Sequence, residues 1–286
     1  MEKIYTKARA KVNLCLSILE KRPDNYHNLE SVFQKINLYD EMWLEKTNTS
    51  NIEIESDIKN VNLEDNIIYK AYQKLKEKFA NITGVKVTLN KKIPMQAGLA
   101  GGSTDCASFL IAMKKLFELN ISNEELEKIG SSLGADVVPC MYNGVVKAEG
   151  IGDIITKIYS DFKYYLVIIK PNACGSTKEM YERLDNRQFI KAVRTNQIVE
   201  SIEEKNIDKL AQNLYNDFEE VSKEFEETEM AKDVLMQNNA LNTLLAGSGA
   251  CVFGIFKNKE DAKKAYKNLQ NDYETYITTS YNKKEK

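Results

Sequence analysis

The chain has 286 residues, and its 40 Lys and Arg nearly balance its 42 Asp and Glu, for a formal net charge of −2. This balance argues against a protein that holds nucleic acid through a broad basic surface, although it leaves room for a small basic pocket that binds a phosphate. The single histidine, His27, excludes a zinc site of several histidines, and any Ser-His-Asp or Cys-His triad would have to use it. Asp, Glu, Lys, Ser, Thr and backbone amides remain, and that set suits phosphoryl transfer.

The sequence predicts neither a secretion signal nor a membrane-spanning helix. The N-terminal residues show no apolar run followed by a small-residue cleavage site, and the longest strongly apolar stretch, 164–169, has the length of a buried strand. We therefore expect a cytoplasmic protein that binds neither membrane nor nucleic acid. The five cysteines, at positions 15, 106, 140, 174 and 251, form no CxxC pair, which predicts free and buried thiols.

The first half of the chain is predicted to be rich in strands. Over 11–18, apolar residues alternate with polar or small ones, so we predict a strand with one buried face and with Lys11 and Asn13 side by side, pointing away from the core. A helix with a capping box at Ser122 and Glu125 should stop at Gly134, directly before Asp136. The other elements predicted in this half are strands near 41–45, 52–55 and 85–89 and helices over 67–79 and 106–117.

The second half of the chain is predicted to be rich in helices, and it ends in strand, helix and strand. A further capping box begins at Ser176, and the region 186–240 is charged, mostly helical and free of Gly and Pro. The elements predicted around it are strands over 145–148, 165–169, 251–256 and 276–280 and a helix over 260–269, with a glycine-rich turn at 245–250. Because the composition changes near residue 157, we predict two α+β domains, 1–157 and 158–286, with the active site in the cleft between them.

The segment from Pro94 to Thr104, Pro-Met-Gln-Ala-Gly-Leu-Ala-Gly-Gly-Ser-Thr, carries the strongest chemical signal. Its glycines let backbone amides approach a ligand closely, and its Ser-Thr pair would sit at a helix N-terminus, where unpaired N–H groups favour phosphate. A plain strand-to-helix turn needs only one glycine and one serine cap. The spacing matches neither the P-loop GxxxxGK[ST] nor the Rossmann GxGxxG pattern.

This segment resembles the ATP loop of the GHMP kinases, which include galactokinase, homoserine kinase and mevalonate kinase. Other segments resemble one family among them, the diphosphocytidyl-methylerythritol kinases, and they follow in family order: Ala10–Leu16, Tyr26–Leu29, Asp65–Ile68, Leu133–Val137 and Leu245–Phe253. The resemblance implies a two-domain GHMP kinase fold, α+β, with an ATP-binding N-terminal domain and a ferredoxin-like C-terminal one. It also implies ATP-dependent phosphorylation of the 2-hydroxyl of a cytidine diphosphate-linked methylerythritol in non-mevalonate isoprenoid synthesis, by a monomer or weak homodimer.

The resemblance implies a role for each matching residue. Asp136 corresponds to the catalytic base, and Lys11 to the lysine that holds this base and stabilises the developing alkoxide. Tyr26 and His27 would recognise cytosine, the first by stacking and the second at the edge of the base. The residues expected to contact ATP are Asn66, Pro94, Met95, Gln96, Ala97, Gly98, Leu99, Ala100, Gly101, Gly102, Ser103 and Thr104. The residues expected to contact substrate are Asn13, Tyr26, His27, Thr177, Tyr181, Gly247 and Gly249.

Two of these assignments stay open at the level of sequence. Mg²⁺ is expected beside the polyphosphate, with Ser103 as a contact to the metal or to a phosphate, but no acidic ligand can be identified. Gly247 and Gly249 fit a tight turn that feeds a core strand as well as they fit a site near the substrate phosphates.

The chain departs from the family pattern at several positions. Asn25 stands where glycine is usual, Gln96 where a small residue is common and Ala100 where glycine often occurs. One extra residue separates Asp136 from Pro139, for which we expect a local shift with the base retained.

Three other functions remain as alternatives. One is another GHMP kinase, acting on mevalonate, its phosphate or homoserine; the Tyr26-His27 pair argues against it. Another is an ATP-binding sensor without turnover, which the intact Lys11 and Asp136 disfavour. The third is an RNA-binding module, which the acidic composition disfavours.

Overall fold

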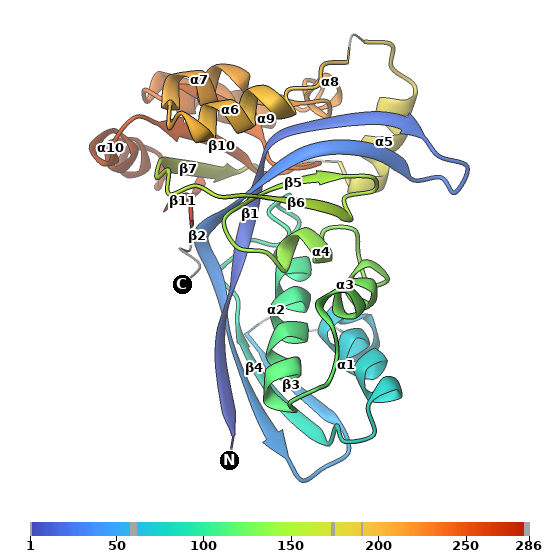
Figure 1. Ribbon diagram of the computed structural model, residues 1–286. Coiled ribbons are helices and arrows are strands. Elements are labelled where there is room, and N and C mark those ends of the chain that lie inside the picture. Colours follow the sequence, from blue (N-terminus) through green and yellow to red (C-terminus); the bar gives the residue numbers. More distant parts are fainter. Residues whose placement is uncertain (1, 58–61, 173–174, 190, 283–286) are drawn as a thin grey trace. The chain divides into compact units, whose positions relative to one another are not determined.

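The computed structural model describes residues 2–57, 62–172, 175–189 and 191–282 (Figure 1). The chain divides into two compact units. Unit 1 comprises Met1–Ala10, Leu38–Ile93 and Ala100–Tyr142, and unit 2 comprises Lys11–Asn37, Pro94–Leu99 and Asn143–Lys286. The strands β1 (Lys3–Lys21) and β2 (His27–Thr47) each contribute to both units. The predicted division at residue 157 follows the order of the chain and stays a prediction.

Unit 1 packs helices against a twisted group of strands. Its elements are parts of β1 and β2, then β3 (Ile52–Ser56), a 3₁₀ turn η1 (Leu63–Asp65), α1 (Ile67–Lys78), β4 (Gly84–Asn90), α2 (Gly101–Leu116), α3 (Asn123–Ser131) and α4 (Val137–Cys140). Strand β4 pairs antiparallel with β2 and parallel with β3. Alternate strand residues such as Leu44 and Val87 pack with Tyr72 of α1 and Phe109 of α2, so the helices cover one face of these strands.

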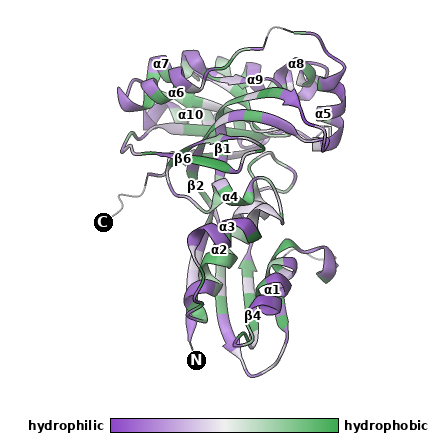
Figure 2. Ribbon diagram, turned by 45° about the vertical axis from the view of Figure 1, so that its right-hand side comes forward, coloured by the Kyte–Doolittle hydropathy of each residue, from purple (hydrophilic) through white to green (hydrophobic). Residues whose placement is uncertain are grey.

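Unit 2 contains an antiparallel sheet with the strand order β11-β7-β10-β9. Its elements, besides parts of β1 and β2, are β5 (Val145–Glu149), β6 (Ile154–Ile158), β7 (Tyr165–Lys170), α5 (Thr177–Asp185), α6 (Thr195–Glu203), α7 (Ile207–Asn213), β8 (Tyr215–Asn216), α8 (Glu219–Ser222), α9 (Glu226–Gln237), β9 (Asn242–Leu245), β10 (Val252–Phe256), α10 (Lys259–Leu269) and β11 (Glu274–Thr279). Strand β10 is buried along its whole length, and Leu235 of α9 and Ala262 of α10 share its core. Hydropathy changes from residue to residue along these helices, as expected where only one face is buried (Figure 2).

Most of the predicted elements are confirmed, but two predictions are wrong. Helix α3 has the predicted capping box between Ser122 and Glu125, yet it ends at Ser131 and not at Gly134. The Ser132 hydroxyl donates to the Ile129 carbonyl, so the last turn is closed without a left-handed glycine. Lys11 and Asn13 do share one side of β1, but they are 3% and 2% exposed and therefore buried.

The cysteines and the apolar strand agree with expectation. Cys15, Cys106, Cys140 and Cys251 are free and buried, and Cys174 lies outside the described residues. The apolar stretch 164–169 forms most of β7 in the core of unit 2. Within the described ranges, no helix combines the length and the apolar character needed to cross a membrane.

Candidate active site

The first part of the glycine-rich loop, Pro94–Leu99, is fastened to the turn before β10. The backbone N–H groups of Ala250 and Cys251 donate to the carbonyls of Gln96 and Ala97, at 3.3 and 3.2 Å. Gly98 adopts a left-handed backbone (φ 71°), and a Cβ there would lie 1.7 Å from the carbonyl oxygen of Ala246. The two glycine-rich segments that the sequence places about 150 residues apart therefore form a single packed feature of unit 2.

The second part of the loop, in unit 1, becomes the first turn of α2. Ala100 is the N-cap with φ 57°, a left-handed value that explains why glycine is often found in its place. Gly102 is exposed, and a Cβ added to it would have no neighbour within 4 Å. The Thr104 hydroxyl donates to the Arg9 carbonyl at 2.5 Å, so this side chain supports the loop. The first N–H groups of a helix lack partners within the helix, and here they belong to three residues with small side chains, Gly101, Gly102 and Ser103.

Lys11 is held by a chain of hydrogen bonds inside unit 2. Its Nζ donates to Asn13 Oδ1 at 2.7 Å, Asn13 Nδ2 donates to Ser31 Oγ at 2.8 Å, and Ser31 Oγ donates to the Cys15 carbonyl at 2.6 Å. A Cβ on Gly247 would lie 3.5 Å from Lys11 Nζ, so the glycine-rich turn borders the ammonium group. Because burying an ammonium group is costly, a lysine fixed in this way is typical of a functional site. Ser31 was missed at the sequence level.

Asp136 and Asn66 lie in unit 1, at helix N-termini. Asp136 is the N-cap of α4, and Pro139 lies in the first turn of this helix. Proline is tolerated there because a first-turn N–H has no helical partner. The Asn66 side chain caps α1 by accepting from the Ile68 N–H at 2.9 Å. Lys11 belongs to the other unit, so its pairing with Asp136 stays a prediction.

The segment predicted to recognise cytosine is a tight turn followed by a buried histidine. Asn25 has φ 68°, which explains the glycine that is usual there, since asparagine tolerates this conformation better than most residues. Tyr26 is 57% exposed, whereas His27 is 9% exposed and stacks on Tyr181, with ring centroids 5.0 Å apart and planes at 19°. The Tyr181 ring also makes a T-shaped contact with Phe218, with ring centroids 4.8 Å apart.

Asp185, at the end of α5, fixes the histidine ring. Its Oδ1 lies 2.6 Å from His27 Nε2, and its Oδ2 accepts from Lys21 Nζ at 2.6 Å. Burial acts to raise the pKa of the Asp185 carboxyl, but the hydrogen bonds from Lys21 and His27 outweigh it and lower the pKa below the ordinary value. Asp185 is therefore an ionised acceptor, and the sequence alone did not indicate it.

The remaining predicted substrate residues lie around the glycine-rich turn. The hydroxyls of Thr177 and Ser248 are hydrogen-bonded at 2.8 Å, and Gly247 and Gly249 have left-handed φ values of 56° and 96°. The amide of Asn216, in β8, donates to the carbonyls of Leu245 and Gly247 at 2.9 and 2.8 Å and so holds the turn in place. No local pattern in the sequence marks Asn216 or the two-residue strand that carries it.

Comparison with known proteins agrees with these features. Residues 66–144 match the model of the GHMP kinases N terminal domain, and residues 198–275 match that of the GHMP kinases C terminal domain. A 4-diphosphocytidyl-2-C-methyl-D-erythritol kinase from Caldicellulosiruptor saccharolyticus is 41% identical over 266 residues, 92% of each chain. This chain belongs to the 4-diphosphocytidyl-2-C-methyl-D-erythritol kinases, within the GHMP kinases.

Solved structures support the two-domain GHMP kinase fold. A crystal structure of a 4-(cytidine 5'-diphospho)-2C-methyl-D-erythritol kinase superposes with a TM-score of 0.84 at 24% identity, covering 98% of this chain and 100% of that one. A homoserine kinase from Cytophaga hutchinsonii gives 0.75 at 18% identity, covering 98% and 95%. The fold is thus shared among kinases of different substrates, and family membership rests on the sequence relatives. The protein is an ATP-using kinase that phosphorylates an alcohol group in isoprenoid biosynthesis.

A buried charge cluster lies beneath the start of α2 in this kinase. Lys91 donates to Asp40 and, at 2.6 Å, to Asp105 of α2, while Asp40 also accepts from the backbone N–H groups of Lys92 and Ile93 at 2.5 and 2.8 Å. Asp40 and Asp105 are almost fully buried. Burial and the neighbouring Asp40 carboxyl raise the pKa of Asp105 to about 8, although Lys91 opposes the shift. The cluster therefore connects β2 with residues 91–93, which precede the glycine-rich loop, and with α2, which follows it.

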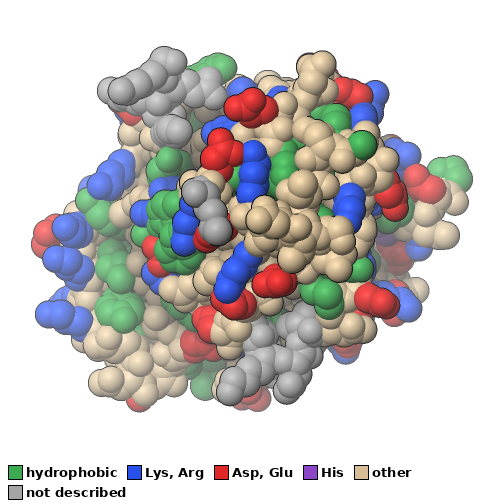
Figure 3. Space-filling view, turned by 90° about the horizontal axis from the view of Figure 1, so that it is seen from below, with side chains coloured by type: hydrophobic (Ala, Val, Ile, Leu, Met, Phe, Trp, Pro, Cys, Tyr) green, Lys and Arg blue, Asp and Glu red, His purple; other side chains and the backbone are tan. Residues whose placement is uncertain are grey.

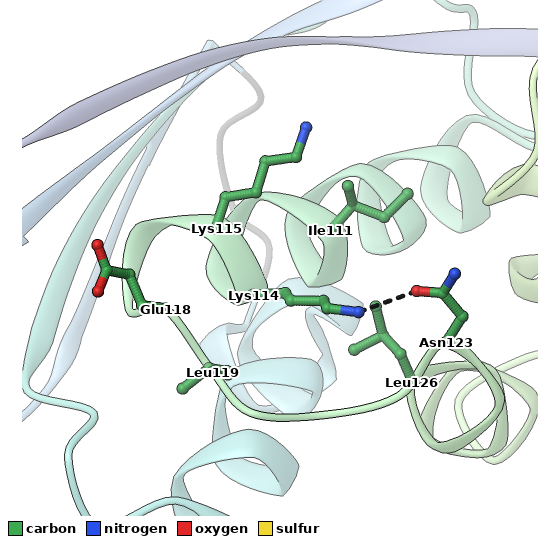
Figure 4. A pocket seen from close by; sticks show the side chains of 7 residues that line it. All are labelled: Ile111, Lys114, Lys115, Glu118, Leu119, Asn123 and Leu126. Atoms are coloured by element: carbon green, nitrogen blue, oxygen red, sulfur yellow. Dashed lines mark hydrogen bonds between the residues drawn. The ribbon is translucent and has the colours of Figure 1, made fainter. Parts of the chain in front are cut away.

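A hollow of about 440 Å³ lies elsewhere on unit 1, between α2 and α3 (Figure 4). Lys114 donates to Asn123 Oδ1 at 2.9 Å on its wall, and Leu119 and Leu126 form its apolar side. No residue predicted to bind ATP or substrate lines this hollow, so we assign it no function.

Proposed function

We propose that this kinase transfers the γ-phosphoryl group of ATP to the 2-hydroxyl of 4-diphosphocytidyl-2-C-methyl-D-erythritol. The observation that carries the proposal is the buried Lys11, oriented by Asn13 and bordered by Gly247. A fixed positive charge beside a glycine-rich turn suits an alkoxide that develops next to phosphate groups.

In this mechanism Asp136 accepts the proton of the substrate hydroxyl while the hydroxyl oxygen attacks the γ-phosphorus of ATP. The bond between the γ-phosphorus and the β–γ bridging oxygen breaks, and ADP leaves. Lys11 holds Asp136 and stabilises the developing alkoxide. A positioned base contributes about 10²- to 10⁴-fold to such a step.

The nucleotide phosphates would lie at the first turn of α2. The backbone N–H groups from Gly101 to Ser103 would donate to phosphate oxygens, helped by the positive end of the helix. Mg²⁺ neutralises a polyphosphate in such reactions and usually keeps phosphate and water oxygens as ligands. Ser103, in the first turn of α2, would contact either the metal or a phosphate. Among the described residues no group of three His, Cys, Asp or Glu side chains could hold a metal ion.

Cytosine would lie against the exposed ring of Tyr26, with His27 at the edge of the base. The near balance of 40 Lys and Arg with 42 Asp and Glu argues against the RNA-binding alternative. On the one face seen in Figure 3, both kinds of charged side chain are present. A cytoplasmic location and a monomeric or weakly dimeric state complete the proposal.

The test is ADP release with Mg·ATP against the diphosphocytidyl alcohol, mevalonate and homoserine, for the natural protein and for Asp136→Asn. The matched control is Asp208→Asn, because Asp208 is an exposed aspartate on α7. Turnover of the cytidyl substrate alone, lowered about 10²-fold or more only in Asp136→Asn, supports the proposal. Turnover of another alcohol instead would discard the cytosine site, and ATP binding without turnover would indicate a sensor.

A further inference from the structure

The environment of His27 determines which of its ring nitrogens carries hydrogen. Asp185 Oδ1 lies 2.6 Å from Nε2, and an ionised carboxylate can only accept, so Nε2 must be the donor. Within the described part of the chain, the other nitrogen, Nδ1, has no hydrogen bond. In a neutral imidazole, a hydrogen on Nε2 makes Nδ1 an acceptor.

We propose that Asp185 is a positioning residue that sets the tautomer of His27, so that Nδ1 accepts the 4-amino group of cytosine and rejects the 4-carbonyl of uracil. This inference rests on the proposed function, in which His27 meets the edge of the base. Cytosine presents an N–H donor at its 4-position, whereas uracil presents an oxygen acceptor there. Two acceptors that face each other without a hydrogen bond disfavour binding, which gives the kinase a means to select cytidine over uridine substrates.

The surrounding contacts restrict the ring to this arrangement. Tyr181 stacks on one face of His27, which fixes the plane of the imidazole. Lys21 donates to Asp185 Oδ2 at 2.6 Å, which orients the carboxylate and leaves Oδ1 for the histidine. In Asp185→Asn, the amide oxygen would turn toward the Lys21 ammonium group and the amide N–H₂ toward His27. The Nε2 atom would then have to accept, and the hydrogen would move to Nδ1.

The chain offers an unusually direct measurement, because His27 is its single histidine. Protein labelled with ¹⁵N-histidine gives the imidazole signals of this residue alone, and the nitrogen shifts report the tautomer without any substrate. The nitrogen shifts also distinguish a neutral ring from a protonated one, so the tautomers are compared in spectra that show the neutral form. We expect hydrogen on Nε2 in the natural protein and on Nδ1 in Asp185→Asn. Lys21→Met retains the carboxylate acceptor, so it should retain the natural tautomer.

The second readout is the ratio of kcat/KM for the cytidine substrate to that for its uridine analogue. We expect this ratio to fall at least about tenfold in Asp185→Asn, mainly through KM, and to stay within about twofold in Lys21→Met. A purely structural role of Asp185 would lower both rates together and leave the ratio unchanged.

The outcomes separate this inference from the proposed function. Hydrogen on Nδ1 in the natural protein, or a tautomer unaffected by Asp185→Asn, overturns the positioning role whatever the turnover. If Asp185→Asn changes the tautomer but not the ratio of kcat/KM for the cytidine and uridine substrates, His27 does not select cytosine through Nδ1. Turnover of the cytidyl substrate would still support the proposed function. If the natural protein fails to turn over that substrate, both the proposed function and the selection of cytosine by His27 are wrong. The spectra still determine whether Asp185 sets the tautomer.

Discussion

Replacing Lys91 with methionine tests whether the buried charge cluster supports the ATP loop. Lys91 is the cation shared by Asp40 and Asp105, and the three side chains keep 10%, 0% and 5% of their surface exposed. Methionine retains most of the apolar stem but leaves two carboxyls without a counter-charge. Removing one partner of a buried pair generally lowers the free energy of unfolding by about 3–5 kcal/mol.

The structure points to the lower end of that range at neutral pH. Because the pKa of Asp105 is raised to about 8, this carboxyl can stay protonated near pH 7, so only Asp40 is left charged. Asp40 still accepts from two backbone N–H groups, which offsets part of the lost pairing. We therefore expect Lys91→Met to lower the free energy of unfolding by about 3 kcal/mol at pH 7. The loss should be larger at pH 9, and the double variant with Asp105→Asn should recover part of it.

Urea unfolding measures the effect, and the chain contains a local reporter. Trp43, the single tryptophan, lies on β2 within unit 1, so its fluorescence follows that unit while circular dichroism follows both. Lys86→Met is the matched control, because Lys86 lies on β4 in an exposed ion pair with Glu55, and we expect no measurable change. If Lys91→Met shifted the Trp43 transition no further than Lys86→Met, the reasoning about the cluster would be refuted.

Three further predictions concern the loop, the lysine and pH. Gly98→Ala should disrupt the loop, because Gly98 has a left-handed φ and an added Cβ would clash with the Ala246 carbonyl. Gly102→Ala should keep the stability or raise it by up to about 1 kcal/mol, yet raise KM for ATP. Denaturation curves and steady-state kinetics distinguish these results. Ser31→Ala removes a partner of Asn13, so kcat should fall several-fold with little change in KM, and an unchanged kcat would exclude a positioning role. Since the pKa of Asp105 is raised in the folded state, folded protein binds the proton more tightly, and stability should fall as pH rises from about 4 to about 8; Asp105→Asn should flatten this slope.

Local patterns predicted the helices and strands well, because these elements are determined largely by residues that are close together in the sequence. The strand over 11–18, the capping box at Ser122 and the helix that follows the glycine-rich loop each depend on a few consecutive residues, and each of these elements is present in the structure. The alternation in β1 could not tell whether its polar side faces water. In the folded chain that side is covered too, so Lys11 and Asn13 are buried and hydrogen-bonded to each other.

The supporting residues escaped prediction for the same physical reason. Ser31 is separated from Asn13 by 18 residues and Asp185 from His27 by 158, and neither has a local pattern that marks it. Asn216 lies in a charged and mostly helical region, where a strand of two residues leaves no periodic signal. Polar side chains that orient other side chains depend on the fold to bring them together, so a single sequence identifies the residues that they support more readily than the supports themselves.

The glycines of the site occur for different physical reasons, and only some of them are evidence for a bound ligand. A Cβ at Gly98 would meet the Ala246 carbonyl at 1.7 Å, and a Cβ at Gly247 would lie 3.1 Å from the Gly98 carbonyl oxygen, so these glycines are required by the packing of backbone on backbone. Their presence needs no ligand. Gly102 is different, because it lies in a helix, where glycine costs about 1 kcal/mol relative to alanine, and its Cβ would meet nothing. Protein packing gives no reason for glycine there. We therefore propose that close approach of a ligand is the reason, and Gly102→Ala is the substitution that tests it.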